Sequence, residues 1–122
     1  MSYKLVWEQR GVVLHFSGQI TISDIVNASV DYEESPQFDD LLYVIADYSQ
    51  ITGCNATSEH IDDVWIVDRG AKFSNNRIKK AIITTTPEVI AMANRYRSAP
   101  DPAFPVKIFS IEAEAREWLN EQ

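Results

Sequence analysis

The stretch Leu41–Ile51, LLYVIADYSQI, decides the fold of this chain. An unbroken apolar run over residues 41–46 ends abruptly in Asp47, Tyr48 and Ser49. A short run that is apolar on both faces is typical of a central strand in a parallel sheet, and such sheets place their sites at the carboxyl ends of the strands. We therefore predict a buried strand over residues 41–47, followed by a surface loop over residues 48–57.

Strand and helix patterns alternate on both sides of this strand. Before it, two strands over 3–9 and 12–17 meet at Arg10-Gly11, and apolar residues alternate through the second with period two. Thr21 and Asp24 then have the spacing of a capping box at the start of a helix that stops at Ser35-Pro36.

After the central strand the same order repeats to the end of the sequence. A second helix is expected over 58–72, and a strand over 79–84 precedes a helix that begins at Thr86-Pro87. A last strand over 106–109 leads to a helix capped by Ser110. The order ββαβαβαβα predicts an α/β domain over residues 1–122, with a mixed, mostly parallel five-stranded sheet, four helices and an antiparallel edge hairpin.

Composition restricts the function. The 122 residues carry a formal net charge of −7, which argues against a general binder of nucleic acid or of anionic membranes. No apolar stretch approaches a membrane span and we see no export signal, so we expect a protein of the bacterial cytoplasm. The lone Cys54 excludes an internal disulfide framework.

The charge is distributed unevenly along the chain. Residues 1–68 carry only Lys4 and Arg10 against twelve acids, whereas residues 69–97 carry seven basic residues against Glu88. The two regions are expected to meet in intramolecular ion pairs or to stay solvated. The alternative is a basic patch for an anionic ligand or an acidic partner, and a homodimer in which the two regions meet across subunits is a further interpretation.

The chain resembles the SpoIIAA-like branch of the STAS superfamily over essentially its whole length. The resemblance rests on three stretches in order: Gly18–Thr21 (GQIT), Tyr43–Ser49 (YVIADYS), and Val106–Phe109 (VKIF) with residues 114–119, EAREWL. It implies a non-enzymatic regulatory or protein-interaction module, because the best-understood members antagonise anti-sigma factors and are switched by serine phosphorylation at an Asp-Ser-Ser-Gly turn. Here that turn reads Asn55-Ala56-Thr57-Ser58.

The departure from the motif leaves two interpretations of this segment. Thr57 or Ser58 could take a phosphate, since a helix start favours an added anion. The simpler interpretation is that Asn55, Thr57 or Ser58 is the cap that starts the second helix. In either case we expect the partner surface to lie over the loop and the start of the second helix, at Ser49, Thr52, Asn55, Thr57, Ser58 and Glu59.

The alternative function is binding of a small hydrophobic ligand or lipid. The SpoIIAA-like fold has been likened to CRAL-TRIO lipid-transfer domains, and apolar side chains on the second and third helices could line a pocket: Trp65, Phe73, Met92 and Tyr96. A stripe at this spacing is also what an ordinary core requires.

Enzyme chemistry is a distant third. Cys54 and His60 lie around the same loop, but a catalytic cysteine needs a base and an orienting group, and nothing in the spacing enforces them. His60 with Asp62 and Asp63 is a poor metal set, so we predict no metal and no cofactor. His15 is expected to be a hydrogen-bonded strand residue, and Asp47 to accept the backbone N–H of Ser49 or Gln50 in an Asx-turn.

Overall fold

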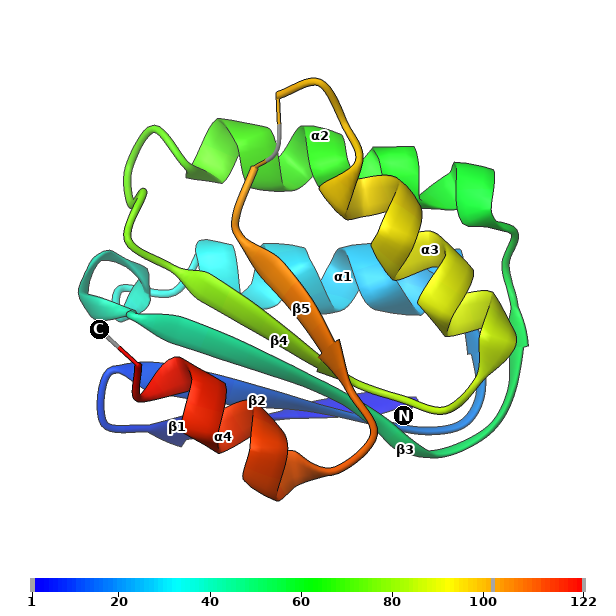
Figure 1. The fold of residues 1–122 in the computed structure, drawn as a ribbon. Helices are drawn as coiled ribbons and strands as arrows, with labels where there is room; N and C mark the ends of the chain where they lie inside the picture. The colour runs from blue at the N-terminus through cyan, green and yellow to red at the C-terminus, as the bar shows by residue number, and fades with distance from the viewer. Residues whose placement is uncertain (1, 102, 122) are drawn as a thin grey trace.

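The computed structural model of the protein describes residues 2–101 and 103–121. Five strands and four helices follow one another in the predicted order (Figure 1). The strands are β1 (Tyr3–Glu8), β2 (Gly11–Thr21), β3 (Tyr43–Asn55), β4 (Lys79–Ile83) and β5 (Val106–Phe109). The helices are α1 (Ile22–Glu33), α2 (Ile61–Ala71), α3 (Pro87–Arg97) and α4 (Glu112–Leu119), with short 3₁₀ turns η1 (Phe38–Asp40) and η2 (Ser58–His60).

The strands form one sheet in the order β1-β2-β3-β4-β5. β1 pairs with β2 in antiparallel register, and every other neighbouring pair is parallel. This confirms the predicted mixed sheet, with the hairpin as its antiparallel edge. Among the described residues no helix has the length and apolar character needed to cross a membrane.

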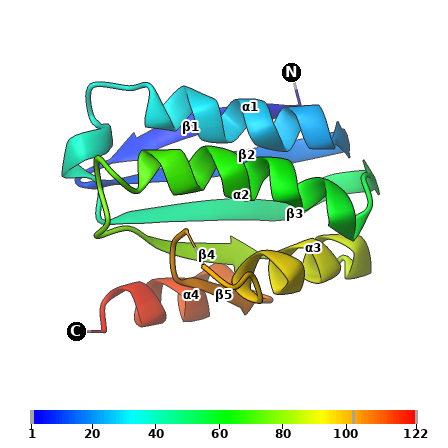
Figure 2. The same cartoon turned by 90° about the horizontal axis from the view of Figure 1, so that it is seen from above.

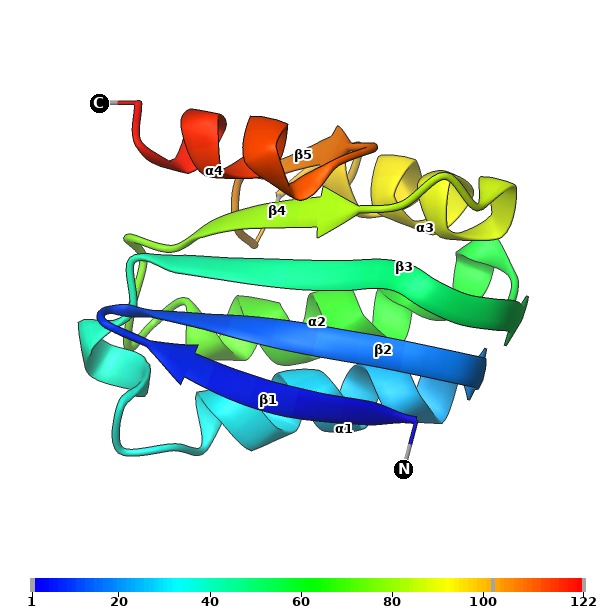
Figure 3. The ribbon, with the colours of Figure 1, turned by 90° about the horizontal axis from the view of Figure 1, so that it is seen from below.

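The two faces of the sheet are covered unequally. α1, α2 and α3 lie side by side over one face (Figure 2), whereas α4 lies on the other face and leaves β1 and β2 uncovered (Figure 3). The larger core fills the first face, where Val12, Leu14 and Phe16 of β2 point, as their period-two pattern predicts. A smaller core of Val13, Ile45, Ala81, Ile83 and Ala115 lies beneath α4.

Local sequence signals set the starts of α1 and α3. Thr21 and Asp24 form the predicted capping box, with the Asp24 backbone N–H donating to Thr21 Oγ1 and the Thr21 N–H donating to the Asp24 carboxylate. Pro87 opens α3, as predicted. The predicted Ser110 cap is wrong, because Ile111 is the N-cap of α4 and makes no side-chain capping bond.

The largest departure from the predictions is the length of β3. The loop predicted over 48–57 is wrong for most of its length, since the strand continues to Asn55. β2 also continues past Tyr3, the first residue of the antiparallel β1, and pairs with this extension as far as Thr21↔Asn55. The second helix is correspondingly later than predicted, because residues 58–60 form η2 before α2 begins at Ile61.

Candidate functional site

The extensions of β2 and β3 form a two-stranded ribbon at the carboxyl end of the sheet. β4 pairs with β3 only as far as Asp47↔Ile83, whereas β2 accompanies β3 to its last residue (Figure 3). Register shifts lie between His15 and Ser17 and between Gly18 and Gln19, and Gly18 has the positive φ of 70° that favours glycine. The ribbon therefore bends past the sheet before the chain enters α1 and α2.

The structure brings the six residues of the predicted partner surface to this end of the molecule, and we call them the ribbon-end surface. Its members lie on the β3 extension, on η2 and at the N-cap between them, and all are exposed except Ser58, which is half-buried: Ser49, Thr52, Asn55, Thr57, Ser58 and Glu59. The β3 backbone that carries Ser49, Thr52 and Asn55 is paired with β2, so this part of the chain is already ordered before a partner binds. Such a surface can offer hydrogen bonds to a partner with little ordering cost.

Thr57 has a definite structural role within this surface. It is the N-cap of η2, and its backbone N–H donates to His60 Nδ1 at 3.1 Å in a reciprocal capping box. Thr57 therefore caps the 3₁₀ turn η2, whereas the N-cap of α2 itself is His60, so none of the three predicted residues caps the second helix directly. His60 is held by the same contact, so its Nδ1 is engaged in capping.

Asp47 also behaves as the sequence predicts. Its Oδ1 accepts the backbone N–H of Ser49 at 2.9 Å, which is the expected Asx-turn, although here the turn accompanies the bend of a continuing strand. Tyr48, the next residue, points into the core and stacks on Phe16 with ring centroids 4.5 Å apart. This stack anchors the base of the ribbon to the main core.

An exposed ion pair lies beside the ribbon-end surface and joins α2 to α3. Arg95 donates from Nε and Nη2 to the two carboxylate oxygens of Asp62 at 3.0 and 2.9 Å. These hydrogen bonds lower the pKa of Asp62 and raise the pKa of Arg95. The pair confirms, at this position, the expected meeting of the acidic and basic regions within one chain.

Cys54 lacks the environment of an activated nucleophile. The thiol is partly buried on β3, and burial raises its pKa, whereas a reactive cysteine needs a lowered one. Among residues 2–101 and 103–121, no group of three or more His, Cys, Asp or Glu side chains has the arrangement of a metal site.

The four residues of the predicted ligand pocket are not gathered into one cavity. Met92 and Tyr96 border an internal cavity of about 30 Å³, whereas Trp65 borders a surface cleft on the outer side of α2 and α3. Phe73 lies just beyond α2 and is 88% exposed. A cavity of that size holds about one water molecule, so a lipid-sized guest would require the helices to separate.

Sequence analysis missed a buried polar cluster under the helices. Asp68 on α2 is fully buried, and its Oδ2 accepts from Lys80 Nζ and from the Tyr96 hydroxyl, each at 2.7 Å. Glu33 faces Asp68, and burial together with that carboxylate raises the pKa of Glu33 to about 10, so Glu33 is protonated at neutral pH. The sequence did hold one signal of this cluster. Lys79 and Lys80 are consecutive in a strand and so point to opposite faces of the sheet, and one of them must therefore enter a core.

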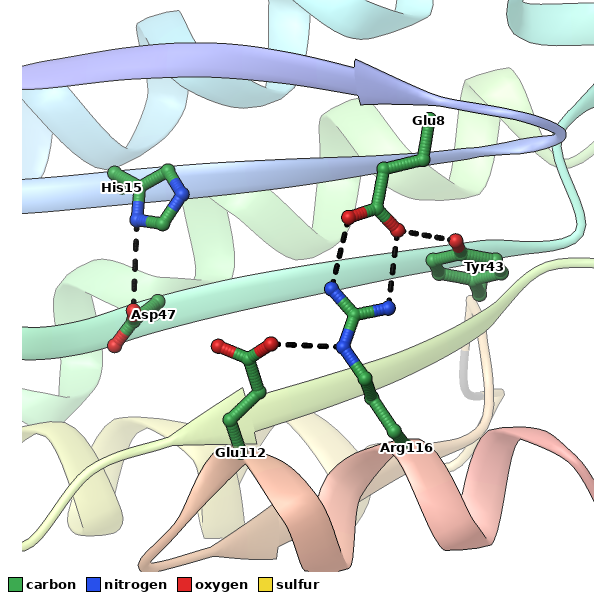
Figure 4. Close-up of polar contacts among 6 residues, drawn as sticks. All are labelled: Glu8, His15, Tyr43, Asp47, Glu112 and Arg116. Atoms are coloured by element: carbon green, nitrogen blue, oxygen red, sulfur yellow. Dashed lines mark hydrogen bonds and ion pairs between the residues drawn. The ribbon is translucent and has the colours of Figure 1, made fainter.

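A second missed network lies on the open face of the sheet (Figure 4). Arg116 of α4 reaches across β3 and forms a bidentate pair with Glu8 of β1, at 3.0 and 2.8 Å, while its Nε donates to Glu112 at 2.8 Å. The Tyr43 hydroxyl donates to the same Glu8 carboxylate. The hydrogen bonds from Arg116 are the main reason that the pKa of Glu8 is lowered.

Glycine permits part of this arrangement. The Tyr43 ring lies over Gly11, where a Cβ atom would come within 2.1 Å of the ring. Farther along the same face, His15 Nδ1 lies 3.5 Å from Asp47 Oδ2 (Figure 4). His15 is thus a strand residue with a polar contact, as the sequence predicted.

Comparison with known proteins bears on the fold. No protein-family model matches the sequence, and no curated protein matches it. The structure is similar to that of the anti-sigma factor antagonist SpoIIAA in its unphosphorylated form, with a TM-score of 0.62 and 12% identity over 98% of this chain and 99% of that chain.

A second similar structure is that of an uncharacterised protein from Shewanella loihica PV-4, a member of the DUF3478 family with a SpoIIAA-like fold. Its TM-score is 0.54, with 16% identity over 96% of this chain and 91% of that chain. At these identities the likeness concerns the fold alone. With five strands, four helices and this sheet order, the protein has a SpoIIAA-like fold.

Proposed function

We propose that the protein is a non-enzymatic regulatory module that binds a partner protein through the ribbon-end surface. The observation that carries this proposal is the extension of β2 and β3 past the rest of the sheet, because it presents Ser49, Thr52 and Asn55 beyond the sheet and leads directly into the turn that holds the other three residues. Functional residues are commonly held this way, on connecting segments positioned by a scaffold. The free thiol of Cys54 fits the reducing cytoplasm in which we place the module.

The fold supports a regulatory role by analogy. The similar protein SpoIIAA is described as an anti-sigma factor antagonist, and the proposal carries over to this chain the general role of binding a protein, without the identity of the partner. The proposal does not depend on phosphorylation of Thr57 or Ser58, because the surface is presented by the unmodified chain.

Charge reversal at Glu59 tests the surface directly. Glu59 is exposed on η2, so Glu59→Lys should leave the melting temperature unchanged while abolishing capture of the partner from a lysate of the source organism. Ser58→Glu should weaken the same capture. The matched control is Glu114→Lys, which makes the same charge change at an exposed position on α4.

The outcome separates the surface from the rest of the molecule. A partner held by the unmodified protein and by Glu114→Lys, but lost with Glu59→Lys, supports the proposal. A bait that captures no stoichiometric partner, or a partner lost only with Glu114→Lys, contradicts it.

Binding of a small hydrophobic ligand remains the alternative proposal. It would use Met92 and Tyr96, which already border the internal cavity, and it requires α2 and α3 to move apart. A native mass spectrum of gently purified protein would show a stoichiometric adduct that is lost on denaturation.

A further inference from the structure

The internal cavity under the helix layer has polar groups in its wall. Its volume is about 30 Å³, and most of its lining is aliphatic or aromatic. Ser29 of α1, Tyr48 of β3 and Lys80 of β4 also border it. These three side chains come from elements that are far apart in the sequence, so tertiary packing alone places them around one space.

The two hydroxyl groups are buried without a partner inside the chain. Ser29 is 1% exposed and Tyr48 is 6% exposed, and burial raises the pKa of Tyr48. Within residues 2–101 and 103–121, neither side-chain hydroxyl has a hydrogen-bond partner. A buried hydroxyl that makes no hydrogen bond costs free energy, so folded proteins rarely leave one unpaired.

The Lys80 ammonium supplies a third polar group. An ammonium carries three N–H donors, and one donor of Lys80 bonds Asp68 Oδ2 at 2.7 Å. Lys80 Nζ also lies 5.2 Å from the centroid of the Tyr96 ring, which attracts a cation through its π face. Because Lys80 is only 5% exposed, a further acceptor for its N–H groups has to lie inside the protein.

The size and the polarity of the cavity together select its occupant. A volume of about 30 Å³ is enough for one water molecule, and the cavities that stay dry in proteins are the wholly apolar ones. A buried water makes about three hydrogen bonds, and this wall offers two hydroxyl groups and one ammonium. Water can accept from an ammonium and donate to two hydroxyl oxygens, so these groups match its hydrogen-bonding capacity.

We propose that this cavity is a binding site for one ordered water molecule, held by Ser29 Oγ, Tyr48 Oη and Lys80 Nζ. The water accepts a hydrogen bond from Lys80 and donates to the two hydroxyl oxygens. It joins α1 to β3 and β4, and Tyr48 connects it to the base of the ribbon. The site uses none of the six residues of the ribbon-end surface, so it does not depend on the proposed partner binding.

Magnetic relaxation dispersion of ¹⁷O-enriched water is the first test, because it counts waters that stay bound for longer than the protein takes to tumble. The unmodified protein should show such a water. Ala46→Val should lose one, since Ala46 borders the cavity and the added methyl groups occupy its space. Ser29→Val fills the same space from α1 and serves as a second filled variant. The matched control is Tyr32→Phe, which removes a fully buried hydroxyl that does not border the cavity and should leave the dispersion unchanged.

The direction of two stability changes tests the hydrogen bonds themselves. Tyr48→Phe and Ser29→Ala each remove one hydroxyl that holds the water, so each should raise the unfolding equilibrium constant roughly two- to tenfold. If the cavity is dry, the same changes remove a buried unpaired hydroxyl and should lower that constant instead. Ser23→Ala, at an exposed position of the same helix, corrects for the higher helix propensity of alanine.

Either measurement can overturn the proposal. It is overturned if the unmodified protein shows no long-lived water, or if the filled variants keep the same dispersion amplitude. It is overturned equally if Tyr48→Phe is more stable than the unmodified protein. A water that the filled variants lose and the Tyr32→Phe control keeps, together with a less stable Tyr48→Phe protein, supports it.

Discussion

The two faces of the sheet use the same kinds of charged groups in opposite surroundings. Beneath the helices, Asp68 and Lys80 are 0% and 5% exposed and lie within one hydrogen-bonded cluster with Tyr96. On the open face, Arg116 and Glu8 form a pair joined by two hydrogen bonds, and their side chains are 37% and 29% exposed. Contact geometry alone therefore does not predict how much an ion pair contributes to stability. Removing one partner of a buried pair lowers the free energy of unfolding far more than removing one partner of an exposed pair, because the remaining buried charge is not solvated.

The largest effect should come from breaking the buried pair. Lys80→Met leaves the buried Asp68 carboxylate with the Tyr96 hydroxyl but without its compensating cation, which should lower the free energy of unfolding by about 3–5 kcal/mol. Urea unfolding measures the loss. The double variant Lys80→Met with Asp68→Leu should recover much of it, and a single variant as stable as the unmodified protein would contradict this account.

A smaller effect, with a definite pH dependence, should come from Glu33 in the same cluster. Its pKa is raised from 4.5 to about 10 by burial and by Asp68, so the folded protein holds a proton that the unfolded chain releases above pH 4.5. The stability associated with this proton is complete below pH 4.5, falls as the pH rises, and is lost by about pH 10.

Glu33→Gln tests that sign. The amide keeps the shape of the neutral carboxyl group and removes its titration. The variant should therefore match the stability of the unmodified protein near pH 4 and exceed it by a margin that grows as the pH rises to 8–9. Melting temperatures across this pH range check it. Parallel curves for the two proteins would mean that Glu33 is not protonated in the folded state.

The smallest effects should come from the open face. Arg116→Ala should cost about 0.5–1 kcal/mol after allowance for solvent screening, and the cost should shrink as salt is added. His15→Gln, on the same face but at the end of a longer contact, should change stability by less than about 0.5 kcal/mol. If Arg116→Ala costs as much as Lys80→Met, the difference between the two faces is not one of desolvation.

Sequence patterns predicted the parts of this fold that depend on local chemistry. The period-two run Val12, Leu14 and Phe16 placed β2 against the core, and Thr21 with Asp24 marked the start of α1. The extension of β3 was missed because polar residues and Gly53 resemble a loop when they are considered alone. They form a strand because β2 continues beside them, and that pairing joins residues more than thirty positions apart.

In the candidate site, too, some features were expected from the sequence and others appeared only in the tertiary structure. The six polar residues of the ribbon-end surface were expected on a loop and a helix start, at the segment that the family resemblance indicates, whereas the structure places Ser49, Thr52 and Asn55 on the β3 strand. Neither charged network was predicted. Arg116 and Glu8 are separated by 108 positions in the sequence, and Asp68 and Lys80 by twelve, so no local pattern brings either pair together.

By itself the sequence determined the order of the elements, the alternation that buries one side of each strand, and the cap that starts α1, because these depend on residues within a few positions of one another. Tertiary structure alone decided how far β2 and β3 run past the sheet, which lysine of Lys79 and Lys80 is buried, and which face stays open. The physical reason is that desolvation and strand pairing are properties of neighbours in space. A local pattern specifies the face of a strand or helix on which a side chain lies. Whether that side chain is buried, and what it contacts, depends on the elements that the rest of the chain packs against that face.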